Sequence, residues 1–127
     1  MVLDSDVLIR YLVRDDLDKA NRFKKFLSSG KKIIITDATC AEVYWTLLRF
    51  YKKDRADIIS ALESVLNHQS IKCNQALLFA CFNTLKNSNI SFMDSYEAAY
   101  ACLYSDCEVM SFDRGFDKIK KVKRVEP

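Results

Sequence analysis

The sequence predicts a single α/β domain over residues 1–127, a three-layer α/β/α sandwich in which helices cover both faces of a central, mainly parallel sheet. A chain of 127 residues, half of them hydrophobic, is long enough for one buried core. Two glycines and one proline are too few for the tight turns of an all-β sandwich. Short apolar runs alternate with segments of helical periodicity, a pattern typical of parallel sheets.

The elements follow one another in that alternating order. A short apolar run at residues 1–3 stops at Asp4, and a β-branched run, Ile33–Ile35, follows the helix-stop signal Gly30. Residues 108–111 form a third run of this kind, and shorter strands are expected at 70–73 and 122–125. Apolar residues at helical spacing predict helices near residues 7–12, 17–28, 38–51, 54–66, 75–86 and 92–104.

Composition excludes several classes of protein. A net charge of +3 is too small to indicate a polyanion partner by itself. Five cysteines with no C-x-x-C pair predict reduced, mostly buried thiols, and His68 has no neighbours suited to a zinc site. No apolar run approaches the roughly 20 residues of a membrane span, and the N-terminus lacks the pattern of a signal peptide, so a cytoplasmic location is expected.

Four acidic residues fall where a parallel sheet would bring them to one edge. Asp4 ends the first strand, Glu42 lies early in the helix after the second, Asp94 begins another helix, and Asp113 follows the 108–111 strand. Connections leaving the carboxyl ends of parallel strands share one edge, where ligands usually bind. We therefore expect these carboxylates to lie close together.

Helix capping offers a second explanation for each acid. Thr39–Glu42 fits the capping box S/T-x-x-E, and Ser91–Asp94 is its aspartate analogue. Asp4 and Asp113 could be simple N-caps. Capping and metal binding are compatible, because a helix dipole keeps a carboxylate ionised. Both interpretations therefore stay open for each residue taken alone.

The four acids as a set predict a divalent-metal site. Clustered carboxylates repel one another unless a cation is present. Hard oxygen ligands without cysteine or histidine favour Mg²⁺ or Mn²⁺ over zinc. Such an ion activates water and stabilises a leaving oxygen, which suits hydrolysis of a phosphodiester bond.

The same residues resemble the motifs of the PIN-domain family, in particular its small VapC-like toxins of toxin–antitoxin pairs. Residues 2–9 (VLDSDVLI) are similar to the family's opening motif, and 41–43 (AEV) to its second. Residues 92–99 (FMDSYEAA) and 111–116 (SFDRGF) are similar to the third and fourth. The four motifs occur in the family's order along the whole chain.

This resemblance implies that Asp4, Glu42, Asp94 and Asp113 bind Mg²⁺ or Mn²⁺ and catalyse the cleavage of RNA. Ser5 and Ser111 would support them through hydroxyl hydrogen bonds. The chain departs from the family at Asp6, where asparagine is common, so Asp6 is either a further metal ligand or a charge that repels phosphate.

The resemblance further implies a homodimer and a cognate antitoxin that blocks the acidic pocket. Aromatic residues in the first two helices and in the stretch 44–51 exceed what one core of this size needs, and an exposed apolar patch of that kind would require a partner. Arg114 is the preferred candidate for a contact with substrate phosphate. The basic stretch at 118–124 would either bind an RNA backbone or form a solvated rim.

Two other functions fit part of the sequence. The segment Asp4–Asp6 also resembles the D-x-D opening of haloacid-dehalogenase-type phosphatases, where an aspartate is the nucleophile. That assignment leaves Glu42 and Asp94 without a role. The second alternative is a catalytically inactive PIN-like module that binds RNA or protein.

Overall fold

The computed structural model describes all residues, 1–127, which divide into two compact units, Met1–Asn74 and Gln75–Pro127. Unit 1 contains four α-helices, and unit 2 contains two α-helices and a short 3₁₀ helix. We describe each unit by itself.

Unit 1 is mostly helical, and a polar side chain caps three of its four helices. Asp4, Asp16 and Thr36 each accept a hydrogen bond from a backbone N–H of the first turn, which satisfies a donor that the helix itself cannot. The helices are α1 (Ser5–Val13), α2 (Leu17–Leu27), α3 (Asp37–Arg49) and α4 (Arg55–Leu66).

The strands of unit 1 are short and parallel. Strands β1 (Ile33–Ile34) and β2 (Ile71–Lys72) pair in parallel register. On the other side of β1, Val2 forms a single parallel bridge with Ile34, supported by hydrogen bonds of 2.8 Å from Leu3 N–H to the Ile34 carbonyl and from Ile34 N–H to the Met1 carbonyl. The N-terminal segment therefore runs beside β1 and delivers Asp4 at its carboxyl end.

Branched aliphatic side chains form the core of unit 1. Ile33 and Ile35 alternate inward on either side of Ile34, which is 41% exposed. Leu8 of α1 and Leu62 of α4 are fully buried. Burying side chains of this size stabilises the fold by about 1.5–3 kcal/mol each, which anchors the helix starts that carry the acidic residues.

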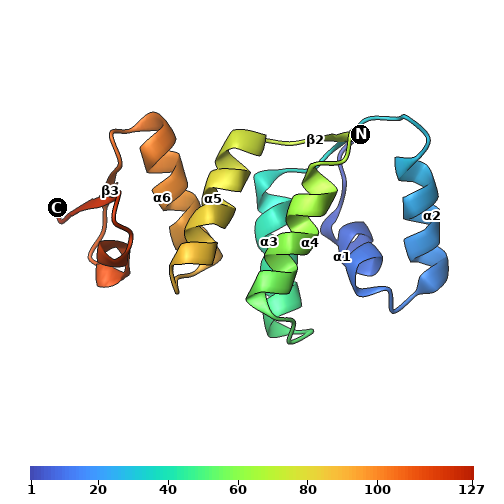
Figure 1. Ribbon diagram of the computed structural model, residues 1–127, viewed down its shortest axis with the longest axis horizontal. Coiled ribbons are helices and arrows are strands. Elements are labelled where there is room, and N and C mark those ends of the chain that lie inside the picture. The colour runs from blue at the N-terminus through green and yellow to red at the C-terminus, as the bar shows by residue number, and fades with distance from the viewer. The chain divides into compact units, whose positions relative to one another are not determined.

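Unit 2 is a helical hairpin followed by a parallel strand pair. Helices α5 (Gln75–Asn87) and α6 (Phe92–Tyr104) lie side by side (Figure 1). Strands β3 (Glu108–Met110) and β4 (Lys123–Val125) pair in parallel and are joined through a 3₁₀ helix, η1 (Arg114–Lys118). A buried cluster of Ile90, Ala98, Phe116 and Ile119 holds η1 in place.

The structure confirms the six predicted helices and the parallel pairing of strands. The predicted first strand is reduced to the single Val2–Ile34 bridge, and η1 was not predicted. The prediction of reduced thiols is wrong for Cys102 and Cys107, which form a disulfide across the turn between α6 and β3. One central sheet between two helical layers stays a prediction. None of the helices is long and apolar enough to cross a bilayer.

Candidate active site

Asp4 lies at the N-terminus of α1, directly after the segment that pairs with β1. Its Oδ2 atom accepts a weak hydrogen bond of 3.4 Å from the Asp6 backbone N–H, so the capping interpretation is correct for this residue. The side chain is otherwise exposed, and its remaining lone pairs face solvent. Ser5, the next residue, is buried. Asp4 is therefore held in place by the helix start and still open to a ligand.

Asp6 differs from Asp4 because a cation already lies beside it. Arg10, one turn further along α1, places its Nε atom 3.3 Å from Asp6 Oδ1. The same guanidinium contacts Asp15 at 2.6 Å and the Tyr51 hydroxyl at 3.3 Å, and Asp15 is the main cause of its raised pKa. The extra negative charge at Asp6 is thus partly offset within unit 1.

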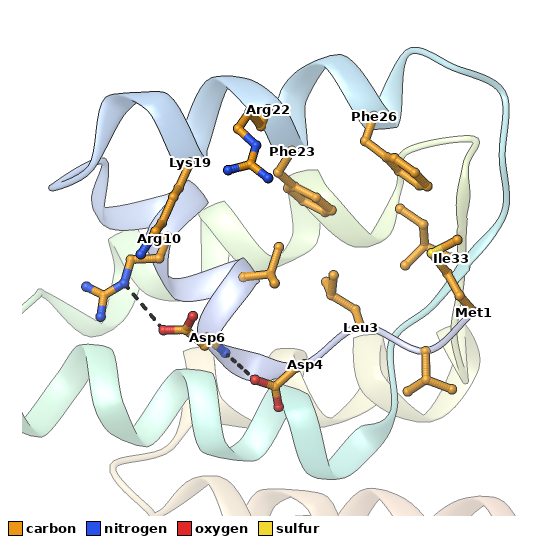
Figure 2. A pocket seen from close by; sticks show the side chains of 12 residues that line it. Met1, Leu3, Asp4, Asp6, Arg10, Lys19, Arg22, Phe23, Phe26 and Ile33 are labelled. Atoms are coloured by element: carbon orange, nitrogen blue, oxygen red, sulfur yellow. Dashed lines mark hydrogen bonds and ion pairs between the residues drawn. The ribbon is translucent and has the colours of Figure 1, made fainter.

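Asp4 and Asp6 form one edge of a pocket of about 580 Å³ (Figure 2). Apolar side chains line its interior, among them Leu3 and, from α2, Phe23 and Phe26. Figure 2 shows Lys19 and Arg22 on α2 with Phe23 and Phe26, and Asp4 and Asp6 at the start of α1. The pocket therefore combines an apolar wall with a rim that carries both acidic and basic groups.

Glu42 lies in the second turn of α3, and the capping explanation for it is wrong. Thr36 is the N-cap of this helix, and its Oγ1 accepts the Thr39 N–H at 3.1 Å. Because α3 begins at Asp37, Thr39 is already inside the helix and cannot form the predicted capping box with Glu42. Glu42 is exposed and makes no ion pair. No local structural role accounts for this carboxylate.

Asp94 lies in the first turn of α6, where Ser91 is the N-cap. The Ser91 hydroxyl accepts the Asp94 backbone N–H at 3.0 Å, as the capping pattern predicts. A second bond from the Ser95 hydroxyl to the Ser91 carbonyl, 2.8 Å long, further fixes this turn. The Asp94 side chain is half-buried.

Asp113 lies in a tight turn between β3 and η1. Its Oδ1 accepts the Gly115 N–H at 2.7 Å, and its own N–H donates to the Ser111 hydroxyl at 2.9 Å. Ser111 is in turn fixed by its N–H bond of 2.9 Å to the Val125 carbonyl of β4. The bond to Gly115 leaves Asp113 Oδ2 free for a ligand. Arg114 is exposed and makes no ion pair.

The structure thus divides the predicted residues between the two units. Asp4, Asp6 and Glu42 belong to unit 1, whereas Asp94 and Asp113 belong to unit 2. Neither unit alone contains three acidic, histidine or cysteine side chains close enough to hold a metal ion. The donor set itself consists of carboxylate oxygens on fixed helix starts and turns, which fits Mg²⁺ or Mn²⁺ better than a softer metal.

Sequence comparison identifies the family. The profile of the PIN domain matches residues 1–122 of the chain. The chain belongs to the PIN domain family. A VapC ribonuclease from Aquifex aeolicus (strain VF5) is 24% identical over 123 residues, which cover 93% of this chain and 90% of the relative.

The PIN match includes all four acidic residues, from Asp4 to Asp113. Two residues that position the acids in this PIN domain were missed by the sequence reasoning. Thr36 caps the helix of Glu42, and Gly115 donates to the Asp113 carboxylate. The signal for Gly115 was present, because Asp-x-Gly is a common sequence for a turn in which the aspartate side chain accepts a backbone N–H.

Proposed function

We propose that the chain is a divalent-metal-dependent endoribonuclease and the toxin of a toxin–antitoxin pair. The observation that carries the proposal is the PIN match over residues 1–122, with each motif acid on a local structure that leaves carboxylate oxygens available. The VapC ribonuclease relative supports RNA as the substrate.

In this proposal Asp4, Glu42, Asp94 and Asp113 together form the metal site, at the carboxyl edge of one mainly parallel sheet in a single three-layer domain. A bound Mg²⁺ or Mn²⁺ would supply an activated water and stabilise the leaving oxygen. The carboxylates would bind the ion, and the N-caps Thr36 and Ser91 fix the starts of the helices that carry Glu42 and Asp94. Arg114, exposed beside Asp113, would contact a substrate phosphate.

Asp6 is not needed as a ligand in this account. Its contact with Arg10 reduces the repulsion that an additional carboxylate would exert on RNA phosphates. Asp6→Asn, which restores the residue common in the family, should therefore retain cleavage. A loss of cleavage as large as that of Asp4→Asn would instead assign Asp6 to the metal site.

The pocket beside Asp4 is the proposed site of the antitoxin. Its apolar wall, including Phe23 and Phe26, suits the apolar face of a helical segment. Its rim carries both carboxylates and cations, which suits polar flanking residues of both charges. An antitoxin bound there would block access to Asp4. Replacing Phe23 or Phe26 is complicated by their packing, so Val7→Ser, at a residue 37% exposed in the pocket, is the better test of antitoxin binding.

Exposed aromatic residues support a homodimer. Trp45 and Phe50 of the α3 region are 62% and 75% exposed, an unusual degree for such large apolar side chains. A second copy of the chain would cover them. Light scattering across a range of concentrations should give twice the chain mass, and Trp45→Ser should shift it toward the monomer. A concentration-independent monomer mass contradicts the dimer.

Cleavage of a mixed RNA pool tests the activity directly. Purified protein should cut RNA with Mg²⁺ or Mn²⁺ and not with EDTA, and Asp4→Asn and Asp94→Asn should each lose this activity. Asp57→Asn, at an exposed position in the first turn of α4, is the matched control and should cut normally. Folded protein that binds RNA without cutting it would select the inactive binding module, and turnover of a small phosphate ester would select the phosphatase.

A further inference from the structure

The basic stretch near the C-terminus consists of two kinds of cation. Lys123 bonds to Glu108 at 2.6 Å, which raises the pKa of the lysine. Arg124 bonds to Asp117 at 3.0 Å and Glu126 at 2.6 Å, and is only 14% exposed. Lys123 therefore links β4 to β3, and Arg124 links β4 to η1 and to the C-terminal segment, so both cations already have structural partners.

Three lysines of the same stretch have no such role. Lys118, Lys120 and Lys121 are exposed, and none forms an ion pair or a side-chain hydrogen bond. Exposed lysines are ordinary at a protein surface, so their exposure alone carries no conclusion. Their shared location within unit 2 is what distinguishes them.

All three lysines line one cleft of about 600 Å³ within unit 2. The facing wall comes from α5 and presents Asn83, Thr84 and Asn87, and apolar side chains of α6, including Leu103, also line the cleft. No aspartate or glutamate lines this cleft. It therefore carries positive charge and amide and hydroxyl groups, with no carboxylate of its own to neutralise the lysines.

The turn that carries the lysines is anchored. Ile119, between Lys118 and Lys120, is 9% exposed and packs in the buried cluster of unit 2. The Ile119 N–H bonds to the Phe116 carbonyl at 3.1 Å, and the Val122 N–H bonds to the Ile119 carbonyl at 3.0 Å. The backbone of the turn is thus held in place, and the lysine side chains are exposed to solvent.

The cleft also lies close to a proposed metal ligand in the same unit. Lys118 ends η1, and Asp113 is the N-cap of that helix. Five residues at the 3₁₀ rise of about 2 Å place their backbones roughly 10 Å apart along the helix axis. A nucleic-acid strand held by the lysines would thus lie near Asp113.

We propose that this cleft, lined by Lys118, Lys120 and Lys121, binds the sugar-phosphate backbone of the RNA substrate beside the cleavage site. The inference rests on the proposed ribonuclease function. Lysines bind phosphates, and asparagine and threonine side chains hydrogen-bond to phosphate and ribose oxygens, including the 2′-hydroxyl that distinguishes RNA. These contacts do not read the bases. The cleft therefore contributes to the affinity for RNA and to the orientation of the strand, but not to sequence specificity.

The test is the salt dependence of RNA binding. A labelled, mixed-sequence single-stranded RNA is titrated by fluorescence anisotropy in EDTA, so that no cleavage occurs, at several salt concentrations. The variant is Lys118→Gln/Lys120→Gln/Lys121→Gln. Each lost phosphate contact lowers the slope of log K against log salt by about 0.7 for a single strand, so the triple variant should lose about 2.

A matched control removes three exposed lysines of unit 1, as Lys24→Gln/Lys25→Gln/Lys53→Gln. It changes the net charge equally and should leave the slope almost unchanged. Equal slopes for the cleft variant and the natural chain, or equal losses in both variants, overturn the cleft. A cleft variant that loses binding to purified antitoxin but not to RNA also overturns it.

Cleavage kinetics separate this inference from the ribonuclease proposal. With Mg²⁺, the cleft variant should raise KM for RNA more than it lowers kcat, and its thermal unfolding should match that of the natural chain. If the natural chain cuts RNA and the cleft variant cuts it with the same KM, the cleft is wrong and the nuclease stands. If the natural chain binds RNA through the cleft without cutting, the nuclease is wrong and the cleft stands.

Discussion

Gly115→Ala tests whether the Asp113 carboxylate must be placed accurately. A Cβ at residue 115 would lie 3.1 Å from Asp113 Oδ1, the same atom that accepts the Gly115 N–H at 2.7 Å. Ordinary van der Waals contacts of this kind begin near 3.4 Å. The carboxylate must therefore move by about 0.3 Å, the difference between the two distances, or rotate away from its hydrogen bond.

The expected effects on stability and on activity have opposite signs. Gly115 has no positive φ, so alanine fits the backbone and lowers the entropy of the unfolded chain, worth about 0.4–1 kcal/mol of stability. A misplacement of 1 Å can cost about 100-fold in rate, so a shift of about 0.3 Å corresponds to roughly fourfold slower cleavage. The variant should be more stable than the natural chain by about 0.4–1 kcal/mol and should cleave RNA measurably more slowly.

The assays are urea unfolding and single-turnover cleavage of an RNA pool in Mn²⁺. Gly30→Ala is the control, because Gly30 has a φ of 77° and no atom near its Cβ position. It should lose about 1 kcal/mol of stability through backbone strain and retain cleavage by the folded fraction. Unchanged cleavage by Gly115→Ala would contradict the need for accurate placement of the Asp113 carboxylate. A loss of stability large enough to explain the slower cleavage would show that the variant is impaired by unfolding and not by a displaced carboxylate.

Three further predictions concern the fold. Thr36→Val removes the hydroxyl that accepts the Thr39 N–H and should lower the free energy of unfolding in urea by about 1 kcal/mol. An unchanged free energy of unfolding would show that packing alone fixes the start of α3. Burial raises the pKa of the Cys40 thiol to about 12, whereas the unfolded thiol ionises near 8.5, so its contribution to stability is complete below that pH and is lost as pH rises toward 12. The natural chain should thus lose up to about 1.4 kcal/mol per pH unit more than Cys40→Ala in this window, and parallel pH profiles would contradict the burial. Alkylation of unreduced, denatured protein should spare Cys102 and Cys107, and mass spectrometry showing five modified thiols would contradict their disulfide.

The sequence predicted the helices well because their apolar periodicity is local. Helix α6 begins and ends at the predicted residues, since Ser91 caps it and its inner face repeats regularly. The start of α3 was predicted to within one residue, but its N-cap was wrongly assigned to Thr39. Thr36 and Thr39 both suit an N-cap, and only the three-dimensional turn decides between them. Helix η1 was missed because five residues are too few for a periodic signal.

The strands and the site depend on contacts between distant residues, which periodicity does not encode. Val2 pairs with Ile34, and helices α1 and α2 separate the two residues in the sequence. The sequence therefore predicted the order of these strands but not the length over which they pair. The disulfide spans a turn in which Asp106 and Cys107 have positive φ, and no glycine signals a tight turn there. For Asp4, Glu42, Asp94 and Asp113 the local surroundings follow from helices and turns. That the four residues meet in one site stays a prediction, which rests on the expected order of strands and on the family motifs.

Binding of Mn²⁺, measured by calorimetry on the natural chain and on single variants from each unit, tests the central claim most directly. If residues of both units form one metal site, Asp4→Asn and Asp94→Asn should each weaken Mn²⁺ binding by about tenfold or more, while Asp57→Asn binds normally. A chain in which Asp94→Asn or Asp4→Asn binds Mn²⁺ as tightly as the natural protein would contradict a shared site.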